Sequence, residues 1–129
     1  MPFNRLHVPN DLSAEMCQAI NTCLHESLVK TCGSNPQDDF CLVSRYNSLD
    51  MMYHPTFLGE RDPKATIIVG ITLLEGRDDA QKEALYREFR SRLDKIGFKS
   101  SNSIIFLTEN RPIDWSFGPA GSVKSVLGL

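Results

Sequence analysis

The stretch ATIIVGITLLEGRDDAQKEALYREF, residues 65–89, predicts a strand, a tight turn and a helix in immediate succession. Residues 65–74 are nearly all apolar, which is typical of an inner strand that is covered on both faces. Glu75-Gly76-Arg77 forms the turn. Asp78 followed by Gln81 resembles a capping box, a pair that often starts a helix. One unit of a layered α/β structure therefore begins here.

The residues that follow complete a strand–helix–strand unit. Apolar residues at helical spacing give the helix one buried stripe, formed by Leu85, Phe89, Leu93 and Ile96. Gly97 is expected to end the helix. Residues 103–109 are expected to form the next strand.

The first half of the chain shows the same order of elements. Residues 2–8 can form a strand, with Asn4, Leu6 and Val8 on one face and Phe3, Arg5 and His7 on the other. Ser13 is a suitable helix N-cap and Gly33 a suitable left-handed end. The apolar stripe between them consists of Met16, Ile20, Leu24 and Leu28. Residues 40–46 form the second strand.

Corresponding elements in the two halves of the chain are separated by the same number of positions. Pro2 and Ala65 are 63 positions apart, and so are Phe40 and Ser103. A duplicated βαβ unit is the simplest explanation. We therefore expect a single domain over residues 1–129, with a pseudo-repeat of 2–50 and 65–110.

The expected fold class is α+β, an α/β two-layer arrangement with a four-stranded sheet and two helices on one face. Residues 65–74 and 103–109 are apolar on both faces, so the second face of the sheet also needs a cover. No sequence is left in the chain to supply it. We therefore expect an oligomer.

Composition and charge exclude several classes of protein. The 129 residues carry a formal net charge of −2 and show no basic stripe, so a dedicated nucleic-acid binder is not expected. The longest apolar runs, 67–71 and 104–107, are far shorter than the roughly 20 residues of a membrane span. The start of the chain lacks the features of a signal peptide. A cytoplasmic protein that binds neither membrane nor nucleic acid is expected.

The four cysteines indicate neither a disulfide framework nor a metal site. They are Cys17, Cys23, Cys32 and Cys41, and no two of them form a CxxC pair. No Cys/His spacing matches a structural zinc site. We expect reduced thiols, no metal and no cofactor.

Pro2 is the first candidate for a catalytic residue. If Met1 is removed, Pro2 becomes a free secondary amine at the start of a strand. Burial would lower the pKa of that amine toward the range of a general base, whereas a nearby carboxylate would keep it cationic. Asp38 could be that carboxylate, or could bind substrate or water. Met-Pro also starts many proteins by chance, and Asp38 lies in a stretch of turn residues, 35–39.

Four further residues are candidates for substrate binding. Arg77 could hold a substrate carboxylate with its planar fork, although an arginine at a helix start is more often only solvated. His25 lies one position beyond Leu24 and could flank the apolar stripe as a half-buried side chain. Trp115 and Phe117 could form a pocket wall or could pack in a subunit interface.

In combination these features resemble the tautomerase superfamily, and most of all its malonate semialdehyde decarboxylase group. The resemblance extends from Pro2 to about Val126. It rests on Met1-Pro2, the doubled βαβ plan, Leu58-Gly59, the Glu75-Gly76-Arg77 turn and ENRPIDWSFG, residues 109–118.

The resemblance implies a homotrimer in which the amino-terminal proline lies deep in a pocket. By position, Pro2 matches the catalytic proline, Asp38 the catalytic aspartate and Arg77 the carboxylate-binding arginine. Trp115 and Phe117 match the aromatic wall. His25 matches a helix histidine that helps to bind the substrate carboxylate in related cis-3-chloroacrylate dehalogenases.

The sequence departs from this pattern at one place. Several members carry a second arginine shortly before the position of Arg77, whereas this chain has residues 73–75, Leu-Leu-Glu. One arginine can still hold one carboxylate in a bidentate pair, but a doubly charged substrate would be held poorly.

Three functions therefore remain open. The first is decarboxylation of a 3-oxo acid such as malonate semialdehyde, with Pro2 protonated. The second is keto–enol tautomerisation of a 2-oxo acid such as phenylpyruvate, with Pro2 neutral. The third is a trimeric binding or signalling protein of the same fold without enzymatic activity.

Overall fold

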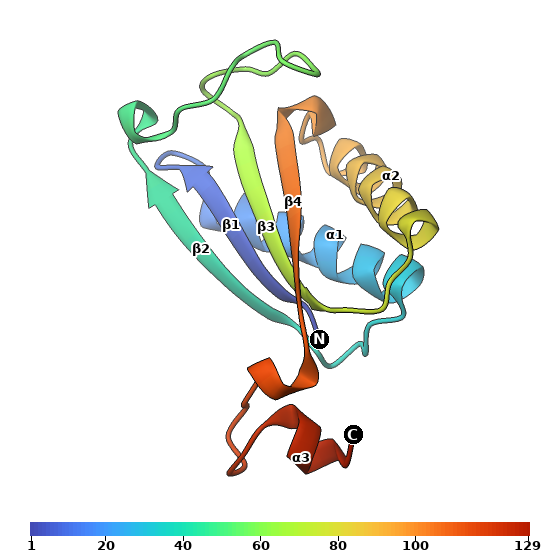
Figure 1. Cartoon of the computed structure of the whole chain (residues 1–129). Coiled ribbons are helices and arrows are strands. Elements are labelled where there is room, and N and C mark those ends of the chain that lie inside the picture. Colours follow the sequence, from blue (N-terminus) through green and yellow to red (C-terminus); the bar gives the residue numbers. More distant parts are fainter.

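The computed structural model describes residues 1–129 and contains one four-stranded sheet with the order β2-β1-β3-β4 (Figure 1). β1 is parallel to β2, β3 is parallel to β4, and the two central strands β1 and β3 are antiparallel. Two βαβ units therefore join along the middle of the sheet, as the sequence predicts. The elements are β1 (Phe3–Pro9), α1 (Ala14–Cys32), β2 (Phe40–Tyr46), β3 (Ile67–Leu74), α2 (Asp79–Lys95), β4 (Ser103–Asn110) and α3 (Val123–Leu127).

Helices α1 and α2 lie side by side on one face of the sheet (Figure 1). The hydrophobic core fills the space between these two layers. Its largest fully buried side chains include Leu6 of β1, Leu24 of α1, Ile71 of β3 and Phe89 of α2. In β1 the alternation is the expected one, with Asn4, Leu6 and Val8 buried under the helices.

The ends of the two long helices confirm the predictions from local sequence. Ser13 Oγ accepts a hydrogen bond of 3.0 Å from the backbone N–H of Met16. Gly33 adopts φ 66°, a left-handed conformation that glycine reaches without the strain a Cβ would cause. At the start of α2, Asp78 and Gln81 cap each other's backbone N–H groups at 3.0 and 2.8 Å.

Several boundaries differ from the sequence prediction, and β1 spans Phe3–Pro9 instead of residues 2–8. β3 begins at Ile67 and not at Ala65, because the Ala65 N–H and the Thr66 hydroxyl both donate to the carbonyl of Asp62 and close a turn. β4 continues to Asn110, whose carbonyl accepts from the N–H of Glu75. Ile96 lies beyond α2 and is 36% exposed, so it does not belong to the buried stripe.

The opposite face of the sheet is open and carries exposed apolar side chains. Strand pairing places four residues in one row across this face: Leu42 of β2, the exposed Arg5 of β1, Gly70 of β3 and Phe106 of β4. Leu42 is 58% exposed and Phe106 is 49% exposed. A Cβ on Gly70 would lie 2.7 Å from Phe106 Cζ, so a side chain at position 70 would force the ring of Phe106 to shift.

The C-terminal segment leaves β4 at one end of the sheet and folds into a separate turn (Figure 1). It contains a 3-10 helix, Pro112–Asp114, and the short helix α3, which the sequence analysis did not predict. None of the helices has the length and hydropathy that a membrane crossing requires.

Candidate active site

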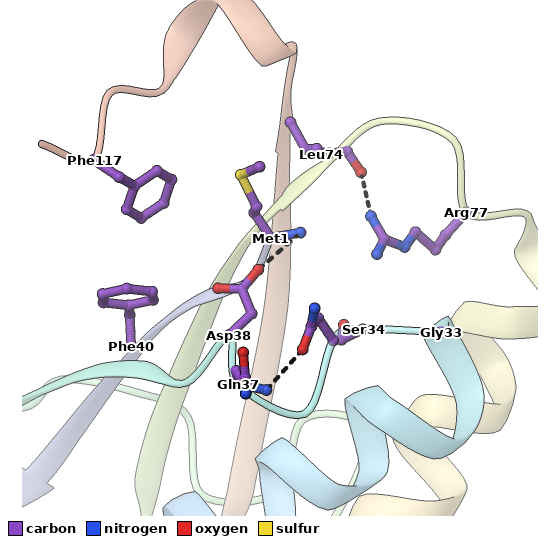
Figure 2. A pocket seen from close by; sticks show the side chains of 10 residues that line it. Met1, Gly33, Ser34, Gln37, Asp38, Phe40, Leu74, Arg77 and Phe117 are labelled. Atoms are coloured by element: carbon purple, nitrogen blue, oxygen red, sulfur yellow. Dashed lines mark hydrogen bonds and ion pairs between the residues drawn. The ribbon is translucent and has the colours of Figure 1, made fainter. Parts of the chain in front are cut away.

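A cavity of about 460 Å³ opens at the edge where the N-terminus, the end of α1, the start of β2 and the end of β3 meet (Figure 2). It has a polar side and an apolar side. The polar side contains Arg77, Asp38 and the turn that follows α1, and the apolar side contains Phe40, Leu74 and Phe117. The complete lining is Met1, Gly33, Ser34, Asn35, Gln37, Asp38, Phe40, Leu74, Arg77 and Phe117.

The turn between α1 and β2 positions Asp38. Asn35 organises this turn, because its side-chain oxygen accepts from the N–H of Gln37 and its carbonyl accepts from the N–H of Asp38, both at 2.9 Å. The chain therefore reverses within a few residues, and Asp38 comes to lie just before the first residue of β2.

Asp38 faces the N-terminus of the chain. Its Oδ2 lies 3.5 Å from the terminal amine of Met1, and its buried Oδ1 has no hydrogen-bond partner. Burial lowers the pKa of the Met1 amine below its ordinary value, the charge of Asp38 opposes that effect, and the charge of Arg77 adds to it. Burial and Arg77 therefore favour the neutral form of an amine at this place, and Asp38 favours the cationic form.

Pro2 is buried directly behind Met1. While Met1 is attached, the Pro2 nitrogen is an amide and carries neither a proton nor a basic lone pair. The residue that faces the cavity in this form of the chain is Met1.

Arg77 is held in place by the backbone. Its Nε donates to the carbonyl of Cys32 at the end of α1, and its Nη1 donates to the carbonyl of Leu74 at the end of β3, both at 3.1 Å. Nη2 has no partner within the chain, so the guanidinium retains free donors at the cavity. Since Arg is positively charged at any physiological pH, this end of the cavity favours an anion.

Three aromatic rings pack in sequence at the apolar side of the cavity. Phe40 and Phe117 are 5.2 Å apart between ring centroids and tilted by 44°. Trp115 stacks on Phe117 at 5.5 Å, with 7° between the ring planes, and its Nε1 donates to the side chain of Asn110. Phe117 lines the cavity directly, whereas Trp115 is absent from the lining and supports Phe117 from the side.

His25 is also absent from the lining. Its Nε2 lies 2.8 Å from the carbonyl of Pro36, which only accepts, so Nε2 carries the proton and donates. The buried Nδ1 has no partner. In this chain His25 contacts the back of the turn that carries Asp38.

Ser34, Gln37 and Phe40 line the cavity, but the sequence analysis did not single them out. Ser34 is 4% exposed and its hydroxyl has no hydrogen-bond partner, which leaves it free to bind a ligand. The only sequence signal for this group was the run of turn residues at 35–39.

The family model described as "Tautomerase enzyme" matches residues 38–118. This chain belongs to the tautomerase family. The matched range begins at Asp38 and includes Arg77, Trp115 and Phe117, whereas Pro2 and His25 precede it. Membership makes the chain an enzyme of the tautomerase superfamily.

Individual relatives match nearly the whole chain and support the same family assignment. The crystal structure of an FG41 malonate semialdehyde decarboxylase inhibited by 3-bromopropiolate is 30% identical, covers 98% of this chain and 95% of that one, and superposes with a TM-score of 0.87. The probable tautomerase YusQ of Bacillus subtilis is 29% identical over 92% of this chain and 94% of its own length. A fused 4-OT symmetric trimer shares the fold, with a TM-score of 0.76, 15% identity and coverage of 96% and 98%.

This tautomerase contains no group of three or more His, Cys, Asp or Glu side chains placed to hold a metal ion. The charged groups around the cavity are the terminal amine, Asp38 and Arg77.

Proposed function

We propose that this enzyme decarboxylates a 3-oxo acid such as malonate semialdehyde, with Pro2 as the amino-terminal residue. The observation that carries the proposal is the convergence of the chain terminus, Asp38 and Arg77 on one cavity with an apolar wall. The similarity to a malonate semialdehyde decarboxylase over 98% of the chain supports this reaction class.

Each of the three groups has a distinct role in the proposed reaction. The free donors of Arg77 bind the substrate carboxylate. Pro2, freed by removal of Met1, is protonated and donates to the carbonyl oxygen of the substrate. Asp38 favours the cationic form of this amine, because an opposite charge within a few ångströms stabilises the charged form.

The bond between the carboxylate carbon and its neighbour then breaks, and carbon dioxide leaves. The electron pair of that bond moves toward the carbonyl oxygen, where the Pro2 cation stabilises the enolate that forms. Protonation of the enolate carbon gives the aldehyde. The apolar wall of Phe40, Leu74 and Phe117 favours the uncharged carbon dioxide over the carboxylate from which it forms.

We also propose that the enzyme is a homotrimer. The open face of the sheet exposes large apolar side chains that include Phe40, Leu42 and Phe106, and further copies of the chain would cover it. The trimeric fused 4-OT of the same fold supports this assembly.

Tautomerisation of a 2-oxo acid such as phenylpyruvate is the second candidate function. Burial lowers the pKa of the Met1 amine despite the proximity of Asp38. The same burial would favour a neutral amine at Pro2, and a neutral amine is the form that removes and returns a proton. The relatives named as probable tautomerases support this alternative. The two reactions differ in the charge of Pro2 near neutral pH.

The test uses protein whose N-terminus is shown by intact mass to be Pro2. Loss of malonate semialdehyde and ketonisation of the phenylpyruvate enol are followed for wild type, Pro2→Ala and Arg77→Ala. Arg87→Ala is the matched control, because Arg87 lies on α2 with its side chain 73% exposed, away from the cavity. We expect both test variants, and not the control, to lose decarboxylation by orders of magnitude.

Ketonisation that depends on Pro2, without any decarboxylation, would establish the second candidate instead. Wild-type rates in Pro2→Ala for both reactions would contradict both candidates.

A further inference from the structure

Ser34 carries a buried hydroxyl group that has no hydrogen-bond partner. The residue is 4% exposed and lines the cavity just after the end of α1. Its backbone is fixed, because its N–H donates to the carbonyl of Leu28 at 3.3 Å. Its Oγ, in contrast, makes no hydrogen bond within the chain. Burial of a hydroxyl without a partner is unfavourable, so a ligand that supplies the partner would remove an existing cost.

Arg77 offers a second unused donor on the same side of the cavity. Figure 2 shows Ser34 and Arg77 on the polar side, across from the rings of Phe40 and Phe117. The guanidinium uses Nε and Nη1 for two backbone carbonyls, and its Nη2 stays free. Nη2 can only donate, and the hydroxyl of Ser34 has no acceptor in the chain for its proton. A ligand with two adjacent acceptor atoms would satisfy both groups.

A carboxylate group has this arrangement, because its two oxygens lie in one plane and both accept hydrogen bonds. Arg77 is the only cationic side chain in the cavity lining, and two of its nitrogens are already engaged. When Nη2 holds one carboxylate oxygen, the other oxygen therefore gains from a further donor beside Arg77. Met1 also lines the cavity, and its removal, which the proposed function requires, opens space for a ligand next to these groups.

We propose that Ser34 is a second anchor for the substrate carboxylate. Arg77 Nη2 donates to one carboxylate oxygen, and Ser34 Oγ donates to the other. The inference rests on the proposed function for the position of the carboxylate at Arg77, and it adds a substrate-binding residue from the turn after α1. Because a hydroxyl carries no charge, this pair of donors suits a substrate with a single carboxylate better than a dianion.

Ser34→Ala should weaken carboxylate binding without weakening the fold. A hydrogen bond to a charged group contributes about tenfold to a hundredfold in affinity. The unfolding midpoint of the ligand-free protein should stay the same or rise, because alanine replaces a buried polar group that has no partner. A serine with a purely structural role would show the opposite pattern, with a lower midpoint and an unchanged affinity.

The test measures the dissociation constants of propanoate and propanamide with the Pro2 form of the protein. The two probes have the same shape, but only propanoate has a charge and two acceptor oxygens. Neither contains the oxo group of the proposed substrate, so binding is measured apart from the reaction. Ligand-observed NMR titration gives the constants, and urea denaturation of the same ligand-free preparations gives the unfolding midpoints.

Ser27→Ala is the matched control. Ser27 is also fully buried, but its Oγ donates to the carbonyl of Cys23 within α1 at 2.6 Å, and it does not line the cavity. We expect wild type and Ser27→Ala to bind propanoate equally well and more tightly than propanamide. We expect Ser34→Ala to bind propanoate about tenfold or more weakly than wild type, with a smaller change for propanamide.

Unchanged propanoate affinity in Ser34→Ala would overturn the inference. Equal affinities of wild type for the two probes would do the same, as would a lowered unfolding midpoint of ligand-free Ser34→Ala. Failure of the proposed reaction has a different signature. If Ser34→Ala loses propanoate binding as expected while wild type does not decarboxylate malonate semialdehyde, the anchor stands and the proposed reaction is wrong.

Discussion

Replacement of Arg77 by alanine should lower both the free energy of unfolding and kcat/KM, through two different sets of contacts. Two guanidinium nitrogens donate to the carbonyls of Cys32 and Leu74 at 3.1 Å. A hydrogen bond from a charged group contributes about 1.5–3 kcal/mol, and the lower end applies to a partly exposed pair. Because water can reach the freed carbonyls, we expect Arg77→Ala to lower the free energy of unfolding by about 2–3 kcal/mol.

The catalytic loss should be larger than this stability loss can explain. Loss of a charge-assisted pair with a substrate carboxylate removes about 3 kcal/mol of transition-state binding, or roughly a hundredfold in kcat/KM. A domain of this size retains several kcal/mol of stability, so Arg77→Ala remains folded under assay conditions. Arg77→Lys keeps the charge without the fork, and we expect it to fall between wild type and alanine in both measurements.

Urea denaturation measures the stability change, and steady-state kinetics on the same preparations measures kcat/KM. Arg87→Ala is the control, because its ion pair with Glu83 is exposed and should contribute less than about 0.5 kcal/mol. Unchanged unfolding midpoints for Arg77→Ala would refute the anchoring role of the two backbone bonds. A destabilised variant with wild-type kcat/KM would refute the role of Arg77 in carboxylate binding.

Three other changes have definite expected outcomes. Asp38→Asn removes the charge that raises the pKa of the terminal amine, so the amine should titrate at a lower pH than in wild type. An NMR titration that showed no downward shift of this pKa would contradict the role of Asp38. Burial, together with the nearby charges of Asp39 and Cys17, raises the pKa of Cys41 to about 11, so native protein should react slowly with iodoacetamide at pH 8 and react fully in urea. Gly70→Ala should destabilise the protein by about 1–3 kcal/mol through its contact with Phe106, and the double variant with Phe106→Ala should recover the part of the loss that the clash causes, as thermal unfolding would reveal.

Features set by neighbouring residues could be predicted from the sequence. The cap at Ser13, the left-handed Gly33 and the Asp78–Gln81 capping box each depend on contacts within a few residues, and all three are confirmed. The duplicated βαβ order is also confirmed, because apolar periodicity determines which face of each element is buried.

Features that depend on contacts far along the chain could not be predicted. The start of β3 was placed too early, because an apolar residue such as Ala65 gives no sign that its N–H is used by the Asp62 turn. The helix α3 is short, and only the folded C-terminal segment stabilises it.

The candidate site shows the same limit. Asp38 and Arg77 are candidates from their residue types and positions and also match the family's pattern, and the structure brings both to one cavity. The sequence does not indicate Ser34, since a serine after a glycine cap has no distinctive pattern and its buried, unpaired hydroxyl is apparent only in the folded structure. Trp115 and Phe117 were treated alike, but the 7° stack places only Phe117 on the cavity surface.

The central claim is that a free Pro2 amine between Asp38 and Arg77 carries out the chemistry. The most direct measurement is the activity of one preparation that retains Met1, followed while a methionine aminopeptidase removes it and intact mass records the fraction of Pro2 termini. We expect turnover of malonate semialdehyde to be absent at the start and to rise in proportion to that fraction. Full activity with Met1 still attached would contradict the claim, because the Pro2 nitrogen is then an amide.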